Sequence, residues 1–266
     1  MHRFRNLFVF NAENAMRVGV EREAFIIDSD GEIIPTANSI LKYLNRHVPI
    51  HSEHYGYELS ACQIESRIGP HHLQDIERQL FETEACLTDC LSEMNRGWRL
   101  SHKEVAPETM PLDVYPDPSG RYQEIVKSMP REVLSAACRV IGTHVHVGMP
   151  DHETALMVYN SVVGQTEKLC QLGDKSRGER LKIYKVVAPN CQPPIYRNWR
   201  DFHSQAVAKG FNYDPRKCWT LIRISKHGTI EFRMFGATAD IREIVSWVRC
   251  CHSLCEQALL KSQVPA

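Results

Sequence analysis

The sequence predicts an α+β fold in which helices pack on one face of a sheet. Several short segments alternate apolar and polar residues, as half-buried strands do, and two longer segments repeat apolar residues at helical spacing. Predicted strands and helices are interspersed along the chain. No internal repeat, low-complexity tract or Ser/Gly linker interrupts the sequence, so we expect one domain over residues 1–266.

The N-terminal half contains two predicted strands and two predicted helices. Residues 17–28 alternate and are followed by a Ser-Asp-Gly turn, which predicts a strand. Residues 36–48 have a capping residue and a short helical pattern. Residues 55–70 predict a second strand that ends at a Gly-Pro pair. Apolar residues then recur over residues 73–100, which predicts one long amphipathic helix.

The C-terminal half continues the same mixture of elements. His102 and Glu104, just after the long helix, are expected to be a solvated terminus. The remaining segments are a loop at 107–122, a short helix and strand within 131–150, a helix at 151–173 capped by Asp151, a mixed loop-like stretch at 173–199, a hairpin at 219–236 and a final helix at 241–260.

Composition excludes several classes of protein. Lys plus Arg and Asp plus Glu both number 32, so the zero net charge does not indicate a nucleic-acid partner. The apolar piece at residues 7–10 is too short for a signal peptide, and no run of 18 apolar residues predicts a membrane span. We therefore expect a cytoplasmic protein with ten reduced cysteines. Cys250, Cys251, His252 and Cys255 fall on the predicted final helix and are expected to pack in the core.

The predicted strands share an unusual feature: one face of each carries charged and imidazole side chains. Because side chains alternate along a strand, residues two apart point the same way. The residues on this face are Glu21 and Glu23, then Gln63, Glu65 and Arg67, then His144 and His146, then Glu231 and Arg233, with Arg223 on the strand before. A plain solvated sheet face favours Thr, Lys and mixed residues instead.

The chemistry of this set indicates a metal-assisted phosphoryl-transfer site. Carboxylates that converge repel one another, and hard divalent cations such as Mg²⁺ or Mn²⁺ relieve that repulsion through oxygen ligands. The five glutamates expected to converge are Glu21, Glu23, Glu58, Glu65 and Glu231. Arg223 and Arg233 can hold phosphate oxygens in forked geometry. No Gly-rich phosphate loop is present, so metals and arginines would have to hold a nucleotide.

Four pieces of the chain, in order, resemble the carboxylate–amine ligases of the glutamate–cysteine ligase type 2 family and, more distantly, the catalytic domain of glutamine synthetase. They are "VGVEREAFIID", "ELSACQIESR", "GTHVHVG" and "HGTIEFRMFG". The resemblance implies a curved antiparallel sheet, like that of the glutamine synthetase catalytic domain, with helices on one face and ATP with Mg²⁺ or Mn²⁺ on the other. It also implies an acyl phosphate, formed on a carboxylate such as the glutamate γ-carboxylate, that an amine converts to an amide.

The resemblance further implies a role for each site residue. Glu21, Glu23, Glu58, Glu65, His144 and Glu231 look like metal ligands, His146 and Arg223 like phosphate contacts, and Arg233 like a transition-state contact, with Glu231, Arg223 and Arg233 as the catalytic set. Lys185 resembles the basic residue of a glutamine synthetase loop that contacts the nucleotide. Gln192 stands where that loop has an acid, so an organic amine such as cysteine, rather than ammonium, is the expected acceptor.

The leading hypothesis is therefore a cytoplasmic, ATP- and Mg²⁺-dependent ligase of a small acid and a small amine, assembled as a homo-oligomer without nucleic-acid or membrane partners. Two alternatives stay open at this point. His144, His146 and a glutamate could hold zinc in a metal-dependent hydrolase. The chain could also be a non-catalytic relative of the fold that binds a ligand.

Overall fold

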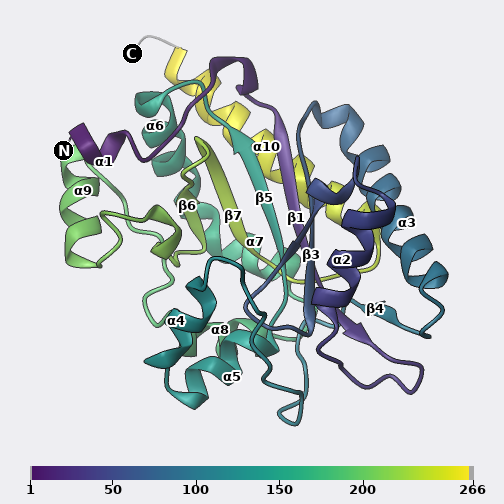
Figure 1. The fold of residues 1–266 in the computed structure, drawn as a ribbon. Helices are drawn as coiled ribbons and strands as arrows, with labels where there is room; N and C mark the ends of the chain where they lie inside the picture. Colours follow the sequence, from purple (N-terminus) through teal and green to yellow (C-terminus); the bar gives the residue numbers. More distant parts are fainter. Residues whose placement is uncertain (1, 264–266) are drawn as a thin grey trace.

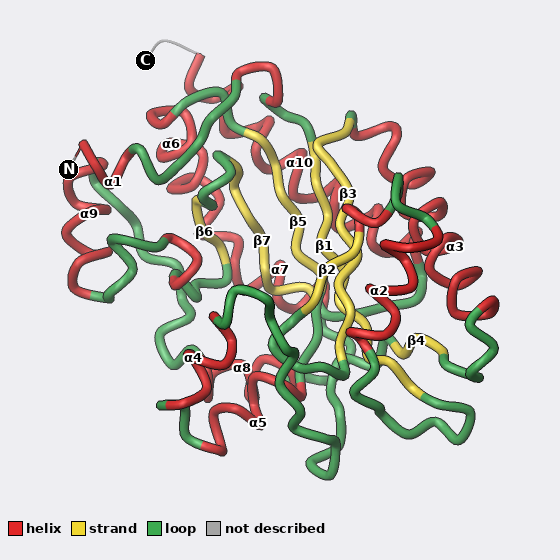
Figure 2. Tube along the Cα trace, viewed as in Figure 1, coloured by secondary structure: helices red, strands yellow, loops and turns green. Residues whose placement is uncertain are grey.

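A seven-stranded sheet forms the centre of the molecule in the computed structural model, which describes residues 2–263. The strand order is β2-β3-β1-β5-β7-β6, β4 pairs with the end of β1, and every pair is antiparallel (Figures 1 and 2). The strands are β1 (Val18–Ile27), β2 (Tyr55–Tyr57), β3 (Gln63–His71), β4 (Arg99–Ser101), β5 (Thr143–Gly148), β6 (Ile222–Ile224) and β7 (Thr229–Phe235).

One face of this sheet is apolar and is covered by helices. α3 (Ile76–Glu93) contacts β3, α6 (His152–Val162) contacts β6 and β7, and α7 (Thr166–Gly173) contacts β7. α10 (Ile241–Gln263) crosses behind β1 and β5 (Figure 1). Val18, Val20, Val145 and Val147 are fully buried against this layer. The predicted fold, an antiparallel sheet with helices against one face, is confirmed.

α10 shows how sequence periodicity builds this layer. Its residues Ile244, Val248, Cys251 and Cys255 recur at helical spacing and have no exposed surface. Trp247 stacks on Phe235 of β7, with ring centroids 5.1 Å apart. All ten cysteines are free, and the predicted core role of Cys251 and Cys255 is confirmed.

The remaining helices lie around the sheet. α4 (Arg121–Lys127), α5 (Arg131–Arg139) and α8 (Glu179–Val187) gather near one end of it, whereas α2 (Ala37–His47) lies beside β2 (Figure 1). α1 (His2–Arg5) and α9 (Trp199–Ala208) come together through Phe4, Trp199 and Phe202. No helix within residues 2–263 is long and apolar enough to cross a membrane.

The structure corrects four predicted elements. The helix predicted over 73–100 is shorter, because left-handed Asn95 and Gly97 end it before β4. The strand predicted over 55–70 is two strands joined by a turn. The helix predicted over 151–173 is split by a 3₁₀ turn at 163–165, although Asp151 caps its start through two backbone N–H groups as expected. The segment 173–199, predicted to be loop-like, contains α8.

Candidate functional site

Strand pairing brings the predicted polar residues together on the sheet face opposite the helical layer. Glu21 of β1 lies opposite His144 of β5, and Glu23 lies opposite Glu65 of β3. His146 lies opposite Glu231 of β7. Because these pairs are direct neighbours across the ladders, four strands contribute side chains to one surface.

The first ligand group consists of Glu21, His146 and Glu231, which each offer one atom within 4.8 Å of the others. His146 Nε2 is 3.5 Å from Glu21 Oε1 and has no hydrogen-bond partner, while His146 Nδ1 bonds the hydroxyl of Thr229 at 2.8 Å. Two ligands about 2.1 Å from one Mg²⁺ ion lie about 3 to 4 Å apart. The spacing of this group therefore fits a shared divalent ion.

This grouping differs from the roles that the family resemblance implied for the two histidines. His146, expected to contact phosphate, completes the first ligand group. His144, expected to bind metal, instead donates from Nδ1 to Glu21 Oε2 at 3.0 Å, and its Nε2 lies 3.9 Å from Glu23 Oε1. The geometry thus favours His146 as the imidazole ligand and His144 as the residue that orients the two glutamates.

The second ligand group consists of Glu23, Glu58 and Glu65, again within 4.8 Å of one another. Glu58 comes from the turn between β2 and β3 and reaches the strand residues from the side. Glu23 Oε2 accepts the backbone N–H of Gly142 at 2.7 Å. All five glutamates predicted to converge therefore do so, in two separate groups.

The two groups differ in the charge they hold without metal. Burial would raise the pKa of Glu21, but the charge on His146 and the hydrogen bond from His144 outweigh it and hold that pKa well below its usual value. Burial is likewise outweighed for Glu231 by Arg223 and Arg233, which lower its pKa. In the second group burial raises the pKa of Glu23 and of Glu58, and burial with the neighbouring Glu58 and Glu21 raises the pKa of Glu65 well above its usual value.

The metal-free protein is expected to be most stable in weakly acidic solution. The second group, Glu23, Glu58 and Glu65, binds protons more tightly in the folded chain than in the unfolded chain. Its contribution to the free energy of unfolding therefore declines as the pH rises from the ordinary pKa of 4.5 toward the raised pKa values. Glu21 and Glu231 have lowered pKa values, so their contribution is complete above 4.5 and is lost as the pH falls.

Urea unfolding with a chelator from about pH 4 to about pH 8 measures this dependence. Adding Mg²⁺ should remove the decline on the neutral side, because the ion replaces the protons. A free energy of unfolding that stays level or increases from weak acid to neutrality without metal would contradict the assignment of the second group.

The two arginines surround Glu231, which has no exposed surface. Two nitrogens of Arg223 donate to the two Glu231 oxygens, at 2.6 and 2.9 Å. The third nitrogen donates to the carbonyls of Arg216 and Cys218. Arg233 Nη1 donates to Glu231 Oε1 at 2.5 Å, but its Nε has no partner. Arg223 therefore orients Glu231, and its expected phosphate contact stays a prediction, whereas Arg233 keeps an unpaired donor.

Lys185 is the predicted site residue that the structure does not bring to this face. It is exposed on α8 and does not line either of the cavities beside the ligand groups, within the part of the chain described. Helical geometry explains this displacement: the segment was compared with a loop, but residues 179–187 coil into a helix whose buried side chains are Arg180 and Tyr184.

Arg180 was not predicted and is the main residue that sequence reasoning missed. Its guanidinium group is buried and donates to three backbone carbonyls, those of Ile141, Arg233 and Met234, at 2.6, 3.4 and 3.1 Å. A side chain at Gly142 would collide with this group. Arg180 thus connects the residues just before β5 to the end of β7.

Two cavities adjoin the first ligand group. The larger, about 660 Å³, is bounded by Glu21 and His146 and extends past Arg67 and His54. The smaller, about 150 Å³, is bounded by Glu21 and Glu231 and by the cationic side chains of Arg216, Arg223 and Lys226. A ligand in both spaces would touch the metal ligands and several positive charges.

The sequence matches the family model of glutamate–cysteine ligase family 2 over residues 17–164, more than half of the chain. This chain belongs to glutamate–cysteine ligase family 2. The matched range contains Glu21, Glu23, Glu58, Glu65 and both histidines, and the predicted family resemblance is confirmed.

Curated relatives support the family membership over most of the chain. A relative in Gloeobacter violaceus is 26% identical over 254 residues, which cover 89% of this chain and 67% of its own length. The "Glutamate--cysteine ligase" of Natronomonas pharaonis is 25% identical over 257 residues, covering 90% of this chain and 69% of its own. The match covers only 40% of the length of a relative in Solibacter usitatus and 62% of the length of one in Thermobifida fusca. This family member therefore spans only part of the relatives that it matches.

Solved structures support the fold. A bifunctional glutathione synthetase from Pasteurella multocida superposes with a TM-score of 0.58 at 11% identity, over 93% of this chain and 40% of its own. A glutamine synthetase from Plasmodium falciparum superposes with a TM-score of 0.50 at 13% identity, over 95% of this chain and 54% of its own. The glutamine synthetase-like fold predicted for this family member is confirmed.

Proposed function

We propose that this chain is the catalytic domain of an ATP- and Mg²⁺-dependent carboxylate–amine ligase. The observation that carries the proposal is the pair of ligand groups on one sheet face, joined through Glu21, His144 and Glu23, with Arg233 beside them. Family membership supports the carboxylate–amine ligase class. The acid is proposed to be glutamate, reacting at its γ-carboxylate, and the amine to be cysteine or another small amine.

The residues present fit Mg²⁺ or Mn²⁺. Five carboxylates and one imidazole supply oxygen-rich ligand sets. Burial raises the pKa of all three carboxyl groups of the second group, although Arg67 forms an ion pair with Glu65 at 3.3 Å. When bound, the ions would neutralise phosphate charge and polarise the phosphoryl group. His144 differs from a zinc ligand because its imidazole is directed at two carboxylates, so the geometry favours the ligase over the zinc hydrolase.

The side chains of this domain have distinct tasks in the proposed reaction. Glu21, His146 and Glu231 would hold the ion at the nucleotide phosphates, whose nucleoside would extend into the 660 Å³ cavity. Glu23, Glu58 and Glu65 would hold the ion next to the acid substrate. Arg233 donates to Glu231, and its Cζ lies 5.8 Å from the centre of the Trp219 ring. It would present its unpaired Nε to the transferring phosphoryl group.

Thermal unfolding with ATP and Mg²⁺ tests this proposal. MgATP at about 100 times its Kd is expected to stabilise the wild type by about 2.7 kcal/mol. Glu65→Ala should lose most of this gain while Glu256→Gln, an exposed carboxylate on α10, should keep it. ATP-dependent phosphate release that requires both an acid and an amine completes the test.

Two results would contradict the proposal. A folded protein that shows no release with any acid and amine pair, and no stabilisation by MgATP, would favour the non-catalytic alternative. One tightly bound zinc without a nucleotide effect would favour the hydrolase. Assembly into a homo-oligomer and a cytoplasmic location stay predictions.

A further inference from the structure

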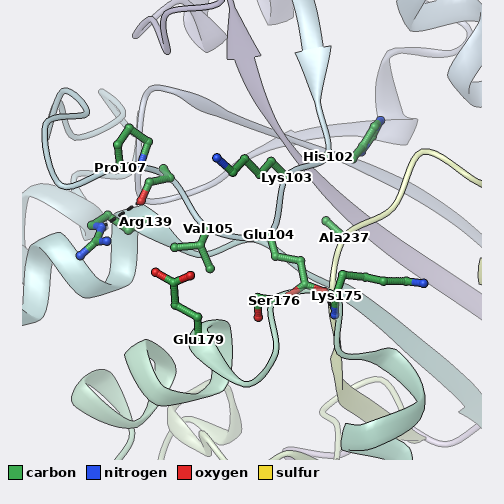
Figure 3. Close-up of a pocket in the computed structure, with 11 residues that line it drawn as sticks. His102, Lys103, Glu104, Val105, Pro107, Arg139, Lys175, Ser176, Glu179 and Ala237 are labelled. Atoms are coloured by element: carbon green, nitrogen blue, oxygen red, sulfur yellow. Dashed lines mark hydrogen bonds between the residues drawn. The ribbon is translucent and has the colours of Figure 1, made fainter.

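A third cavity, of about 360 Å³, is lined by residues that follow β4, that surround the start of α8 and that follow β7. Its floor is apolar, formed by Val105, Ala106, Pro107 and Ala237. Figure 3 shows the charged side chains of Lys103 and Glu179 on opposite sides of Val105. This cavity shares no lining residue with the two cavities beside the first ligand group.

Glu104 makes this cavity more than a surface hollow. The sequence predicted it to be solvated, but the residue is only 4% exposed. Its Oε1 accepts the backbone N–H of Lys175 at 2.7 Å, whereas its Oε2 is closed to water and has no hydrogen-bond partner. The nearby hydroxyl of Ser176 does not supply one, because it donates to Asp174 at 3.0 Å. A buried carboxylate oxygen left unpaired indicates a missing donor.

The rim adds two charges of opposite sign. Lys103 and Glu179 are exposed, and neither forms an ion pair with any residue of the described chain. The other cations of the lining are already engaged: Arg139 with Glu108 at 3.1 Å and Lys175 with Glu243. The lining therefore carries one unpaired positive charge, on Lys103, and one unpaired negative charge, on Glu179, with apolar Val105 between them.

The lining of this cavity is separate from both ligand groups. None of its residues belongs to either group, and buried Arg180 is not part of the lining. Arg180 is close enough to sense both sides, since burial lowers the pKa of its guanidinium group while the charges of Glu23 and Glu104 oppose that effect. A molecule in the third cavity would not use the proposed metal ligands.

We propose that this third cavity binds a small zwitterion of the α-amino-acid class. The ammonium group pairs with Glu179 and is attracted by the nearby carboxyl group of Glu104, and the carboxylate pairs with Lys103. The side chain of the ligand packs on Val105, Ala106 and Pro107. This site is distinct from the proposed acid site, because its lining contains no residue of either ligand group.

Calorimetric titration of the whole chain with L-alanine, L-valine and L-methionine, in chelator and without nucleotide, tests the proposal. At least one amino acid should bind saturably, and ethylamine and propionate, which each carry one of the two charges, should bind at least about tenfold more weakly. Glu179→Gln and Lys103→Gln should each weaken binding about tenfold, the loss of one charged hydrogen bond. These exposed substitutions do not threaten the fold, unlike a change at Glu104.

Three controls make the result specific. Glu256→Gln and Lys182→Gln, exposed residues of matched charge outside the cavity, should leave binding unchanged. Glu23→Ala should also leave amino-acid binding in the third cavity unchanged. This variant separates the third cavity from amino-acid binding beside the two ligand groups. Because the assay contains neither nucleotide nor metal, its outcome does not depend on ligase activity.

The proposal is overturned by any of three outcomes. These are the absence of saturable binding by all three amino acids, binding that survives both cavity variants but not Glu23→Ala, and binding of ethylamine or propionate as tight as that of the amino acids.

Discussion

Glu231→Gln is expected to reduce ligase turnover by about a thousandfold and to lower the free energy of unfolding by about 3 to 5 kcal/mol. The carboxylate is fully buried, belongs to the first ligand group and is the ion-pair partner of both Arg223 and Arg233. Glutamine keeps the shape but removes the charge, so two buried guanidinium groups lose their counter-ion. The ion at the phosphates also loses a ligand.

Two measurements separate these effects. Urea unfolding of the metal-free variant reports the loss of the ion pairs, and MgATP-induced stabilisation reports the loss of the ligand. Glu256→Gln is the matched control, since its carboxylate is exposed on α10. Normal turnover in Glu231→Gln would remove Glu231 from the proposed site, whatever its stability.

Arg180→Met is expected to lower the free energy of unfolding by about 3 kcal/mol. The substitution keeps most of the apolar volume but leaves the carbonyls of Ile141, Arg233 and Met234 without their donor in a buried place. Arg180→Lys should recover only a small part of this loss, because one ammonium group cannot reproduce the planar fork.

Chemical denaturation of both variants beside Arg200→Met, an exposed arginine of α9, measures the effect. If lysine restored full stability, the positive charge rather than the three hydrogen bonds would be what Arg180 contributes. If both variants were as stable as Arg200→Met, the three hydrogen bonds of Arg180 would not contribute to the free energy of unfolding.

The strand residues of the site could be predicted because alternation is a local property. Residues two apart in a strand point to the same side, so the polar face of each strand follows from the sequence of that strand alone. This holds for Glu21 with Glu23, for His144 with His146 and for Glu231. Which histidine meets Glu231 depends instead on the pairing of β5 with β7, including the irregularity between Thr143 and Val145. No single strand records that register, so the sequence alone could not show which histidine would lie with Glu21 and Glu231.

The residues outside strands were harder to place. Arg180, Lys185 and Glu104 lie in segments without a clear apolar period, and their burial is decided by tertiary packing around the sheet end. Arg180 follows a glycine in left-handed conformation that starts α8, a feature that a polar stretch does not reveal. The cavity beside Glu104 combines residues from four distant parts of the chain, so it could not be anticipated from spacing.

The pairing of β7 with β5 has a consequence for how the chain acquires its shape. The first ligand group joins residues 21 and 231, which are far apart in sequence, and β7 follows the other six strands of the described sheet along the chain. Contacts of such long separation form slowly, because a large loop must close before they contribute. We therefore expect metal capture by the proposed ligands Glu21, His146 and Glu231 to be a late event in folding. Refolding followed by Mn²⁺ binding should lag behind refolding followed by helical circular dichroism.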